Sequence, residues 1–472
     1  MPTSDSRTPP PVPATPDLDA PALVTRLRAT FDSGKTRPLA WRREQLKALR
    51  KMLVEREAEL LDALAADLGK PRLEAWATDI GFVINEIDHA LKHLRRWTRA
   101  KRVRTPLVTK PARARVVPEP LGVVLVIAPW NYPVQLALAP LVGAIAAGNA
   151  VVLKPSEIAA HTSGALAHFL PEYIDPEAIA VVEGAVGETK ALLAERWDHI
   201  FYTGNGRVGC VVMEAASRHL TPVTLELGGK SPAIVDSTAN LEVAARRIAW
   251  GKYLNAGQTC IAPDYVLVAR EKADQLVELI RRAVFDFYGN DPQTSPDYAR
   301  IVSDNQFQRL SGLLTSGTAA VGGETDKATR YIAPTVLRDV ALDAPVMEEE
   351  IFGPLLPILP VGGVDEAISF VNAHEKPLAL YVFSGDKAAT DRVIERTSSG
   401  GVCVNATLYQ VAVPGLPFGG VGESGQGAYH GKATFDVFSH AKPVLKKSTR
   451  PDPDLAYPPY TDKKERLMRR FL

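Results

Sequence analysis

Cysteine is scarce in this sequence of 472 residues, which contains only Cys210, Cys260 and Cys403. Three cysteines so far apart exclude a disulfide framework and a CxxC metal site. A reducing compartment fits this usage best, and we therefore expect a cytoplasmic protein.

An excess of charge of either sign is also missing, because 55 basic residues face 54 acidic ones, for a net charge of +1. This balance gives no reason to expect a nucleic-acid or membrane partner. One stretch departs from it: Lys92 to Arg115 holds ten Lys or Arg and no acidic residue. An RNA-binding module is one interpretation, but a solvated face or a subunit contact is favoured, with Arg113–Val117 alternating like an edge ribbon.

A secretory signal and a membrane span are not found either. Residues 1–22 are rich in Pro, Thr, Ser and Asp without an apolar run, which predicts a disordered tail. Residues 121–153 lack any charge, but Pro129, Pro133, Pro140, Asn131 and Gln135 interrupt them. The segment therefore predicts a strand, a loop, a helix and a second strand, with no transmembrane segment in the chain.

The remaining pattern is an alternation of short apolar strands and helices. It begins at Val123–Ile127, continues through residues 200–219, and resumes from 231 to 268 and from 379 to 405. Before it, leucines at helical spacing predict a helical region from Trp41 to Leu68, which Gly69 ends. Such alternation predicts α/β architecture with mostly parallel sheets, whose ligands bind at the carboxyl ends of the strands.

Gly204-Asn205-Gly206-Arg207-Val208-Gly209 fits GxGxxG between a predicted strand and a predicted helix. Its amides can hold a pyrophosphate, although a purely structural glycine turn explains the motif equally well. Glu226 follows Gly209 by 17 residues, which suits a ribose-binding acid. It also ends an apolar run before two glycines, where a half-buried carboxyl group with a raised pKa suits a general base.

Cys260 lies in the polar, glycine-containing stretch NAGQTC rather than on an apolar face. Free cysteines are usually inert and buried, as we expect of Cys210 and Cys403, but this setting can present a thiolate to a carbonyl carbon. Asn131, between two prolines at a strand end, either caps a turn or donates to an oxyanion. The acidic run Glu348–Glu350 has no histidine nearby, so ribose binding is favoured over a metal site.

Taken together, these segments resemble the aldehyde dehydrogenase superfamily, in particular its class-three group of short, dimeric members. The resemblance covers residues 46–445 and rests on motifs that occur in the family's order. They are PWNYP at 129–133, VVLKPSE at 151–157, the glycine turn, LELGGK at 225–230, GQTC at 257–260, EEIFGP at 349–354 and LPFGGVGESG at 416–425. The run GAYHGK at 427–432 resembles the class-three group specifically.

The resemblance implies a function: oxidation of a medium- or long-chain aliphatic or aromatic aldehyde to its acid with NAD, NADP being possible. It implies that Cys260 attacks the aldehyde, that Asn131 and the Cys260 amide stabilise the oxyanion, and that Glu226 activates the water that hydrolyses the thioester. The cofactor residues it implies are Lys154, Glu157, Gly204, Gly209, Glu350 and Phe352. For the substrate tunnel, the class-level candidates are Tyr132, Trp250 and His430.

The resemblance also implies an architecture of two Rossmann-type α/β domains plus a small β bridging element, and a homodimer. Residues 23–98 and 119–225 would form the cofactor-binding domain, 226–408 the catalytic domain, 99–118 and 409–450 the bridging element, and 451–472 a C-terminal tail. Two rival functions keep the fold: a dehydrogenase that passes the acyl group to coenzyme A, and a non-enzymatic, lens-like structural protein. Glu226 argues against the first, and the combination of Cys260, Glu226 and Asn131 against the second.

Overall fold

The computed structural model describes residues 18–471. The predicted disordered tail, residues 1–22, lies mostly outside this range, but its end is helical: α1 spans Ala20–Asp32. The early start has a local cause, since the Asp19 side chain accepts a hydrogen bond from the Ala22 amide at 2.9 Å and a proline occupies the first turn. Ala20–Ala22 are therefore a correction to the predicted tail.

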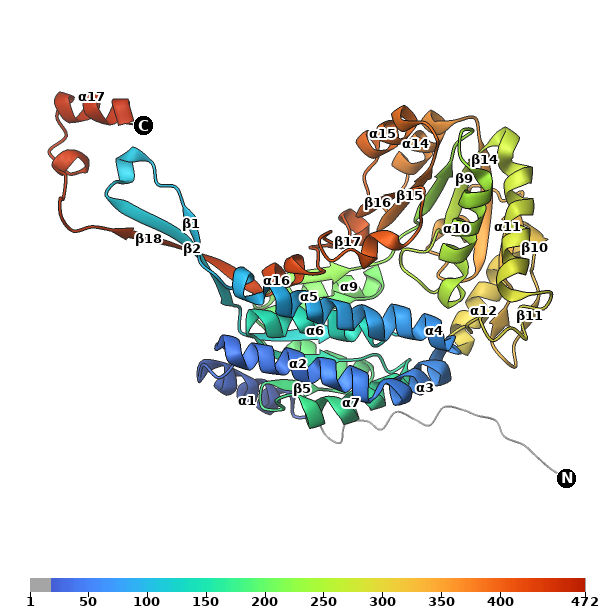
Figure 1. Ribbon diagram of the computed structural model, residues 1–472, viewed down its shortest axis with the longest axis horizontal. Helices are drawn as coiled ribbons and strands as arrows, with labels where there is room; N and C mark the ends of the chain where they lie inside the picture. The colour runs from blue at the N-terminus through green and yellow to red at the C-terminus, as the bar shows by residue number, and fades with distance from the viewer. Residues whose placement is uncertain (1–17, 472) are drawn as a thin grey trace.

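The first α/β unit is built on a six-stranded sheet of order β17-β7-β6-β3-β4-β5, in which β17 alone runs antiparallel (Figure 1). Its strands are β3 (Val123–Ile127), β4 (Ala150–Lys154), β5 (Ile179–Val181), β6 (His199–Thr203), β7 (Val223–Glu226) and β17 (Gly425–Gln426). Its helices are α1, α2 (Leu39–Glu55), α3 (Glu57–Leu68), α4 (Arg72–Ala75), α5 (Gly81–Trp97), α6 (Gln135–Ala147), α7 (Ala160–Tyr173), α8 (Val186–Ala194), α9 (Gly206–Ser217) and α16 (Lys432–Val437). A π-helical turn, Trp76–Ile80, joins α4 to α5.

The charge-free segment 121–153 contains a strand, a helix and a second strand, as predicted, and these elements, β3, α6 and β4, are buried throughout. A helix that is apolar on every side must be enclosed by protein or lipid, and here α2, α5 and the sheet enclose α6. Among residues 18–471, no helix has both the length and the apolar character needed to cross a membrane.

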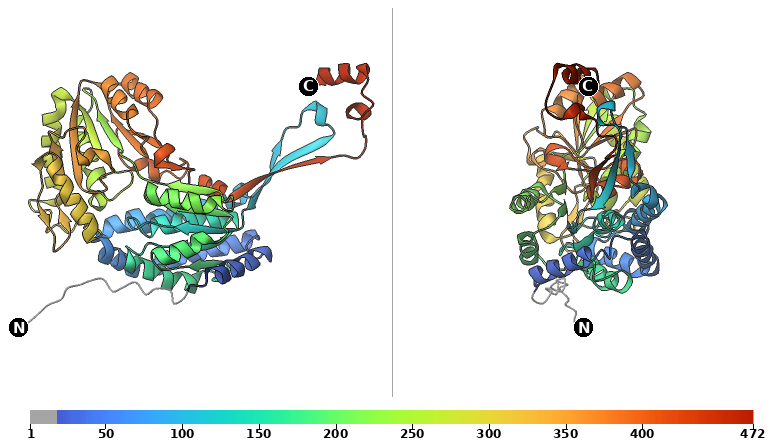
Figure 2. Two further views of the ribbon diagram at one scale, coloured as in Figure 1. Left: turned by 180° about the vertical axis from the view of Figure 1, so that it is seen from behind. Right: turned by 90° about the vertical axis from the view of Figure 1, so that its left-hand side faces the viewer.

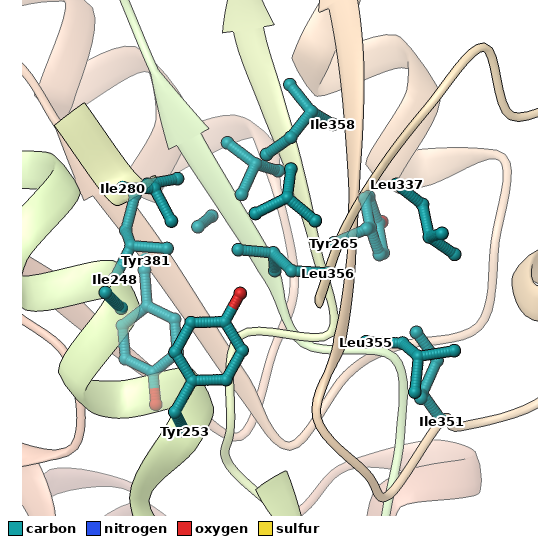
Figure 3. Packing of buried hydrophobic residues seen from close by; sticks show 14 of the residues in the cluster. Ile248, Tyr253, Tyr265, Ile280, Leu337, Ile351, Leu355, Leu356, Ile358 and Tyr381 are labelled. Carbon is teal, nitrogen blue, oxygen red and sulfur yellow. The ribbon is translucent and has the colours of Figure 1, made fainter. Parts of the chain in front are cut away.

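The second α/β unit has a seven-stranded sheet of order β10-β13-β14-β9-β8-β15-β16, with only β10 antiparallel. The strands are β8 (Pro232–Val235), β9 (Tyr265–Ala269), β10 (Thr318–Val321), β13 (Thr335–Arg338), β14 (Leu355–Val361), β15 (Ala379–Phe383) and β16 (Gly401–Val404), with a small hairpin of β11 (Thr325–Asp326) and β12 (Tyr331–Ile332) beside them. The helices are α10 (Leu241–Tyr253), α11 (Ala273–Tyr288), α12 (Asp304–Leu313), α13 (Pro345–Glu348), α14 (Val364–Asn372) and α15 (Lys387–Arg396). Figure 3 shows the core where Ile248 and Ile280 of the helices meet strand residues such as Leu356 and Ile358.

A three-stranded antiparallel ribbon, β1-β2-β18, extends away from both units (Figure 2). It consists of β1 (Lys101–Val103), β2 (Ala112–Pro120) and β18 (Ser439–Lys447), and the last helix, α17 (Asp462–Phe471), lies near its tip (Figure 1). The alternation at Arg113–Val117 predicted an edge ribbon, but β2 is the central strand, because β18 arrives from the far end of the sequence and pairs along its whole length. The alternating burial of β2 follows from its open face.

The helical region predicted over Trp41–Leu68 consists of two helices. α2 ends before Arg56, whose backbone (φ −109°, ψ 21°) departs from helical geometry, and α3 follows at once. Gly69 ends α3 as predicted, in the left-handed conformation (φ 59°) that glycine adopts without a steric cost.

Candidate active site

Three segments carry the predicted catalytic residues to one place between the two α/β units. Asn131 follows the buried strand β3, Glu226 is the last residue of β7, and Cys260 lies in the loop between α10 and β9. In the sheet order, β3 continues to β4 and β5 on one side, while β6 and β7 lie on the other. This reversal of strand order creates the crevice in which doubly wound sheets bind ligands.

The loop before Cys260 has an unusual backbone that its neighbours hold in place. Asn255 and Ala256 are left-handed (φ 52° and 50°), a conformation that costs free energy for residues other than glycine. The buried Gln258 compensates: its Nε2 donates to the carbonyl oxygens of Asn255 and Arg300, both at 3.0 Å, and its Oε1 accepts from the Val302 amide at 2.9 Å. The loop that presents Cys260 is therefore rigidly supported.

Asn131 and Tyr132 lie directly against this loop. The Asn131 Nδ2 donates to the Gln258 carbonyl at 3.1 Å, and the Asn131 carbonyl accepts from Asn255 Nδ2 at 2.8 Å. The Tyr132 hydroxyl shares a 2.6 Å hydrogen bond with Thr259 Oγ1, next to the thiol. The PWNYP loop and the nucleophile loop thus form one hydrogen-bonded structure, whose contacts reach Gln258 and Thr259, the two residues before Cys260.

Glu226 is almost completely buried, with 2% of its surface exposed. Neither of its carboxyl oxygens has a hydrogen-bond partner among the described residues. Burial raises its pKa well above the usual value, because the ionised form loses its hydration. A carboxyl group with a raised pKa and no protein partner is suited to bind a water molecule and take its proton.

Two carboxyl groups influence the pKa of the Cys260 thiol. Burial raises the pKa of the thiol most, and the charges of Glu350 and Glu226 raise it further. Hydrogen bonds from the backbone amides of Cys260 and Ile261 act in the opposite direction and favour the thiolate. The same amide of Cys260 is the one that the sequence predicts for oxyanion binding.

Glu350, one of these two carboxyl groups, lies on the loop between α13 and β14. A Cβ at Gly228 would clash with its carboxylate, so the glycine in LELGGK makes the room for it. Desolvation and the nearby Asp264 raise its pKa to about 8, against the hydrogen bond from the Gly229 amide and the charges of Lys230 and Lys252. Close by, Phe352 meets the Trp130 ring edge-on at 5.3 Å between centroids.

The predicted dinucleotide residues line the carboxyl ends of β4 and β6. Lys154 ends β4, and its Nζ donates to Glu157 at 2.9 Å. The glycine turn follows β6, and Asn205 caps α9 by accepting from the Val208 amide at 2.9 Å. At Gly204 a Cβ would clash with the Tyr202 hydroxyl, at Gly209 it would press on Leu227, and at Gly206 it would meet open space.

These residues fit a bound dinucleotide. A helix amino end faces the open space at Gly206, where amides and the helix dipole favour a phosphate. Lys154 and Glu157 supply a cation and an acceptor at the end of β4, two strands along the sheet from β6. The Glu350 carboxyl lies near the thiol at the other end of the site. When bound, NAD or NADP would supply the hydride acceptor for the reaction.

The three tunnel candidates lie in different surroundings. Tyr132 contacts the nucleophile loop through Thr259. Trp250 stacks on Tyr409 with 5.4 Å between ring centroids, and His430 packs against Phe418 with 5.3 Å between ring centroids. Burial lowers the pKa of His430 to about 3, so its imidazole is neutral, and its Nε2 has no hydrogen-bond partner in the described part of the chain. Trp250 and His430 thus both contact the segment from Tyr409 to Phe418.

Sequence reasoning missed several residues that support the site. Lys70, Glu74 and Asp79 come from the helical region and reach the PWNYP and nucleophile loops. Charged residues in a helical pattern are usually solvated, so only the break in the leucine spacing after Gly69 could have pointed to these residues.

The two other cysteines differ in their exposure. Cys210 is exposed on α9 rather than buried, which corrects its interpretation as a structural core residue, whereas Cys403 packs against the second core and is partly buried. The side chain at position 210 points away from the sheet because Gly209 and Val212 occupy the buried face of the helix.

Across residues 18–471, no group of three or more His, Cys, Asp or Glu residues is arranged to hold a metal ion.

Comparison with known proteins identifies the family. The family model described as "Aldehyde dehydrogenase family" matches residues 8–444. Aldehyde dehydrogenase family 3 member A2 of Rattus norvegicus is 53% identical over 451 residues, covering 95% of this chain and 93% of that protein. A second protein of Rattus norvegicus, named "Aldehyde dehydrogenase, dimeric NADP-preferring", is 51% identical over 90% of this chain and 94% of its own length.

A solved structure agrees. The substrate-bound state of Staphylococcus aureus AldH is 46% identical and superposes with a TM-score of 0.94, covering 97% of this chain and 100% of that one. The chain therefore belongs to the aldehyde dehydrogenase family, whose members oxidise aldehydes with NAD or NADP through a thioester on a cysteine.

Proposed function

We propose that Cys260, Asn131 and Glu226 carry out this oxidation, and that the substrates are medium- or long-chain aliphatic or aromatic aldehydes. The main support is the environment of Cys260. Its loop is hydrogen-bonded to Asn131, and its thiol lies within the electrostatic reach of the unpartnered Glu226 carboxyl. An amide, a thiol and a proton acceptor around one point are the groups that thioester chemistry needs.

In the first half of the reaction, the Cys260 sulfur bonds to the aldehyde carbon, and the carbonyl oxygen becomes an oxyanion. The Asn131 Nδ2 and the Cys260 amide donate to that oxygen. Asn131 can do so because it is fixed by two bonds to the nucleophile loop, so no free energy is spent on ordering it during the reaction. Conversion of this adduct to the thioester requires the carbon to lose a hydride, which bound NAD or NADP would accept.

In the second half, Glu226 takes a proton from a water molecule, whose oxygen bonds to the acyl carbon. The carbon–sulfur bond then breaks, the carboxylic acid leaves, and the thiolate is restored. The raised pKa of Glu226 makes it a stronger base than an exposed carboxylate, and its unpartnered oxygens leave room for the water.

For the cofactor, we propose that Lys154 and Glu157 hold the adenine ribose, that the turn from Gly204 to Gly209 holds the pyrophosphate, and that Glu350 and Phe352 position the nicotinamide ribose. NAD is the expected preference, because Glu157 would repel a 2′-phosphate. NADP remains usable because Lys154 can pair with that phosphate, and one relative is named NADP-preferring.

We further propose a cytoplasmic homodimer joined through the ribbon, in line with the relative named as dimeric. The ribbon leaves Leu107 and Leu445 exposed, and exposed apolar side chains on a protruding sheet favour association. Residues 23–98 with 119–225, 226–408, and 99–118 with 409–450 are the proposed cofactor, catalytic and bridging parts. The pairing of β17 with β7 and of β18 with β2 supports a bridging segment that also touches the cofactor part.

The test is absorbance of the reduced cofactor with purified protein, NAD or NADP, and a panel of short, long and aromatic aldehydes. We expect the wild-type protein to turn over aldehyde without coenzyme A, and we expect Cys260→Ala to have lost this activity. Turnover that requires coenzyme A would indicate the acyl-transferring rival. Absence of turnover on every aldehyde would favour a structural protein, and full activity of Cys260→Ala would refute the assigned nucleophile.

A further inference from the structure

A buried ion pair lies behind the PWNYP loop and plays no part in the chemistry described above. Lys70 Nζ and Asp79 Oδ2 are 2.8 Å apart, and both side chains are 0% exposed. Removing two charges from water is costly, and such pairs contribute little net stability compared with apolar residues of the same size. The pair therefore calls for another explanation.

All the other hydrogen bonds of the pair go to the loop that carries Asn131. Lys70 Nζ donates to the Asn131 carbonyl at 3.2 Å and lies 4.1 Å from the centre of the Tyr132 ring. Asp79 Oδ1 accepts from the amides of Val134 and Gln135, both at 3.1 Å, where α6 begins. The pair thus fixes the backbone carbonyl of the oxyanion donor and the chain that follows it into α6.

The same segment also reaches the nucleophile loop. Glu74 Oε1 accepts from the Asn255 amide at 2.8 Å, and Asn255 Nδ2 shares the Asn131 carbonyl with Lys70. Asp79 belongs to the π-helical turn Trp76–Ile80, an irregularity that often accompanies functional sites. One short stretch, residues 70–80, thus holds both loops that meet at the thiol.

We propose that Lys70 and Asp79 are positioning residues: they set the Asn131 amide at the distance from Cys260 that oxyanion binding requires. This rests on the proposed function, in which Asn131 is the oxyanion donor. A small displacement of a pre-positioned donor costs much of its effect, since the donor acts only within a narrow range of distance and angle.

The experiment replaces both charges at once by Lys70→Met with Asp79→Asn, because a single change would leave an uncompensated buried charge. The asparagine keeps the acceptor for the α6 amides, so the protein is expected to fold with an unfolding temperature near that of the wild type. We expect kcat to fall about 10- to 100-fold with the dissociation constant for NAD, measured by fluorescence quenching, within twofold of wild type. The matched control is Arg50→Met with Asp88→Asn, an exposed ion pair between α2 and α5, which should change neither quantity.

A double-mutant cycle separates positioning from a merely structural role. In an Asn131→Ala background, the Lys70/Asp79 double change should lower kcat by less than twofold, because the group that the pair positions is already absent. An equal loss in both backgrounds, or an undiminished kcat in the folded double variant, would overturn the proposal.

If the double variant does not fold, Lys70→Gln with Asp79→Asn takes its place, since the shorter neutral amide at position 70 can donate to the side-chain oxygen at position 79 without leaving a buried charge. The two proposals can fail separately. Full activity of Asn131→Ala would refute the oxyanion role and this inference together. Loss of activity in Asn131→Ala and Cys260→Ala with normal kcat in the Lys70 variants would refute this inference alone.

Discussion

At the residue scale, the site depends on side chains whose burial is not compensated by protein partners. Glu226 is the clearest case, since its carboxyl oxygens are enclosed without a hydrogen bond in the described chain. Burial of this kind disfavours the ionised form, and natural proteins retain it where the group has a chemical task.

Glu226→Gln is expected to form the thioester but not to hydrolyse it. Loss of a general base typically lowers turnover by about 10²- to 10⁴-fold. A rapid burst of reduced cofactor followed by almost no steady state, observed by stopped-flow absorbance, would fit. Steady-state turnover at the wild-type rate would show that another group activates the water.

The wild-type rate of hydrolysis should also depend on pH. A base acts in its ionised form, and burial raises the pKa of Glu226, so steady-state kcat should rise with pH through a value above the usual glutamate range and then level off. This rise should disappear in Glu226→Gln.

Glu157 governs the expected preference between cofactors. Glu157→Gln removes the carboxylate that would repel a 2′-phosphate and frees the Lys154 ammonium from its ion pair. We expect the ratio of kcat/KM for NADP over NAD to rise about 10-fold or more, by the free energy of one close charge pair. Glu59→Gln, at an exposed position on α3 of the same unit, serves as the control. A ratio that changes equally in both variants would argue against the assignment.

At the scale of single elements, the glycines of the turn at 204–209 differ in whether there is space for a side chain. Gly204→Ala would place a methyl group against the buried Tyr202 ring, and overpacking of this kind costs about 1–3 kcal/mol. Gly206→Ala meets open space and should leave stability unchanged. Thermal unfolding of the two variants without cofactor tests this, and equal melting temperatures would contradict the packing.

The elements also show how far the sequence was informative. The strand-helix-strand nature of residues 121–153 and the stop at Gly69 were predictable, because apolar periodicity and helix-ending glycines are local signals. The break at Arg56 and the central position of β2 were not. The central position depends on pairing with β18, more than three hundred residues away.

The candidate site divides in the same way. Cys260, Asn131 and Glu226 stand in distinctive short motifs, so a resemblance could name them. Lys70 and Asp79 carry no such motif, and only the folded chain brings them beneath Asn131. Residues that touch the reacting atoms lie in recognisable sequence motifs, whereas the residues that hold them in place can be identified only from the tertiary structure.

At the scale of the whole molecule, the ribbon is the proposed site of association. Leu445→Lys, on β18 with 58% of its surface exposed, should shift a dimer toward monomers in sedimentation velocity, because a charge would be buried at the interface. Leu342→Lys, at a comparably exposed position (63%) on the second unit, should leave the sedimentation coefficient unchanged. Identical behaviour of the two variants would place the interface elsewhere.

The antiparallel strand β17 has a consequence for how the protein is made. It pairs with Glu226 through Gly425, and Phe435 and Phe438 after it complete the core of the first unit. The ribosome therefore delivers the last strand of the first sheet only after the entire second unit has emerged. Glu226, the proposed base that releases the acid, therefore acquires its final surroundings late in translation. A chain that ends before β17 cannot complete the reaction cycle.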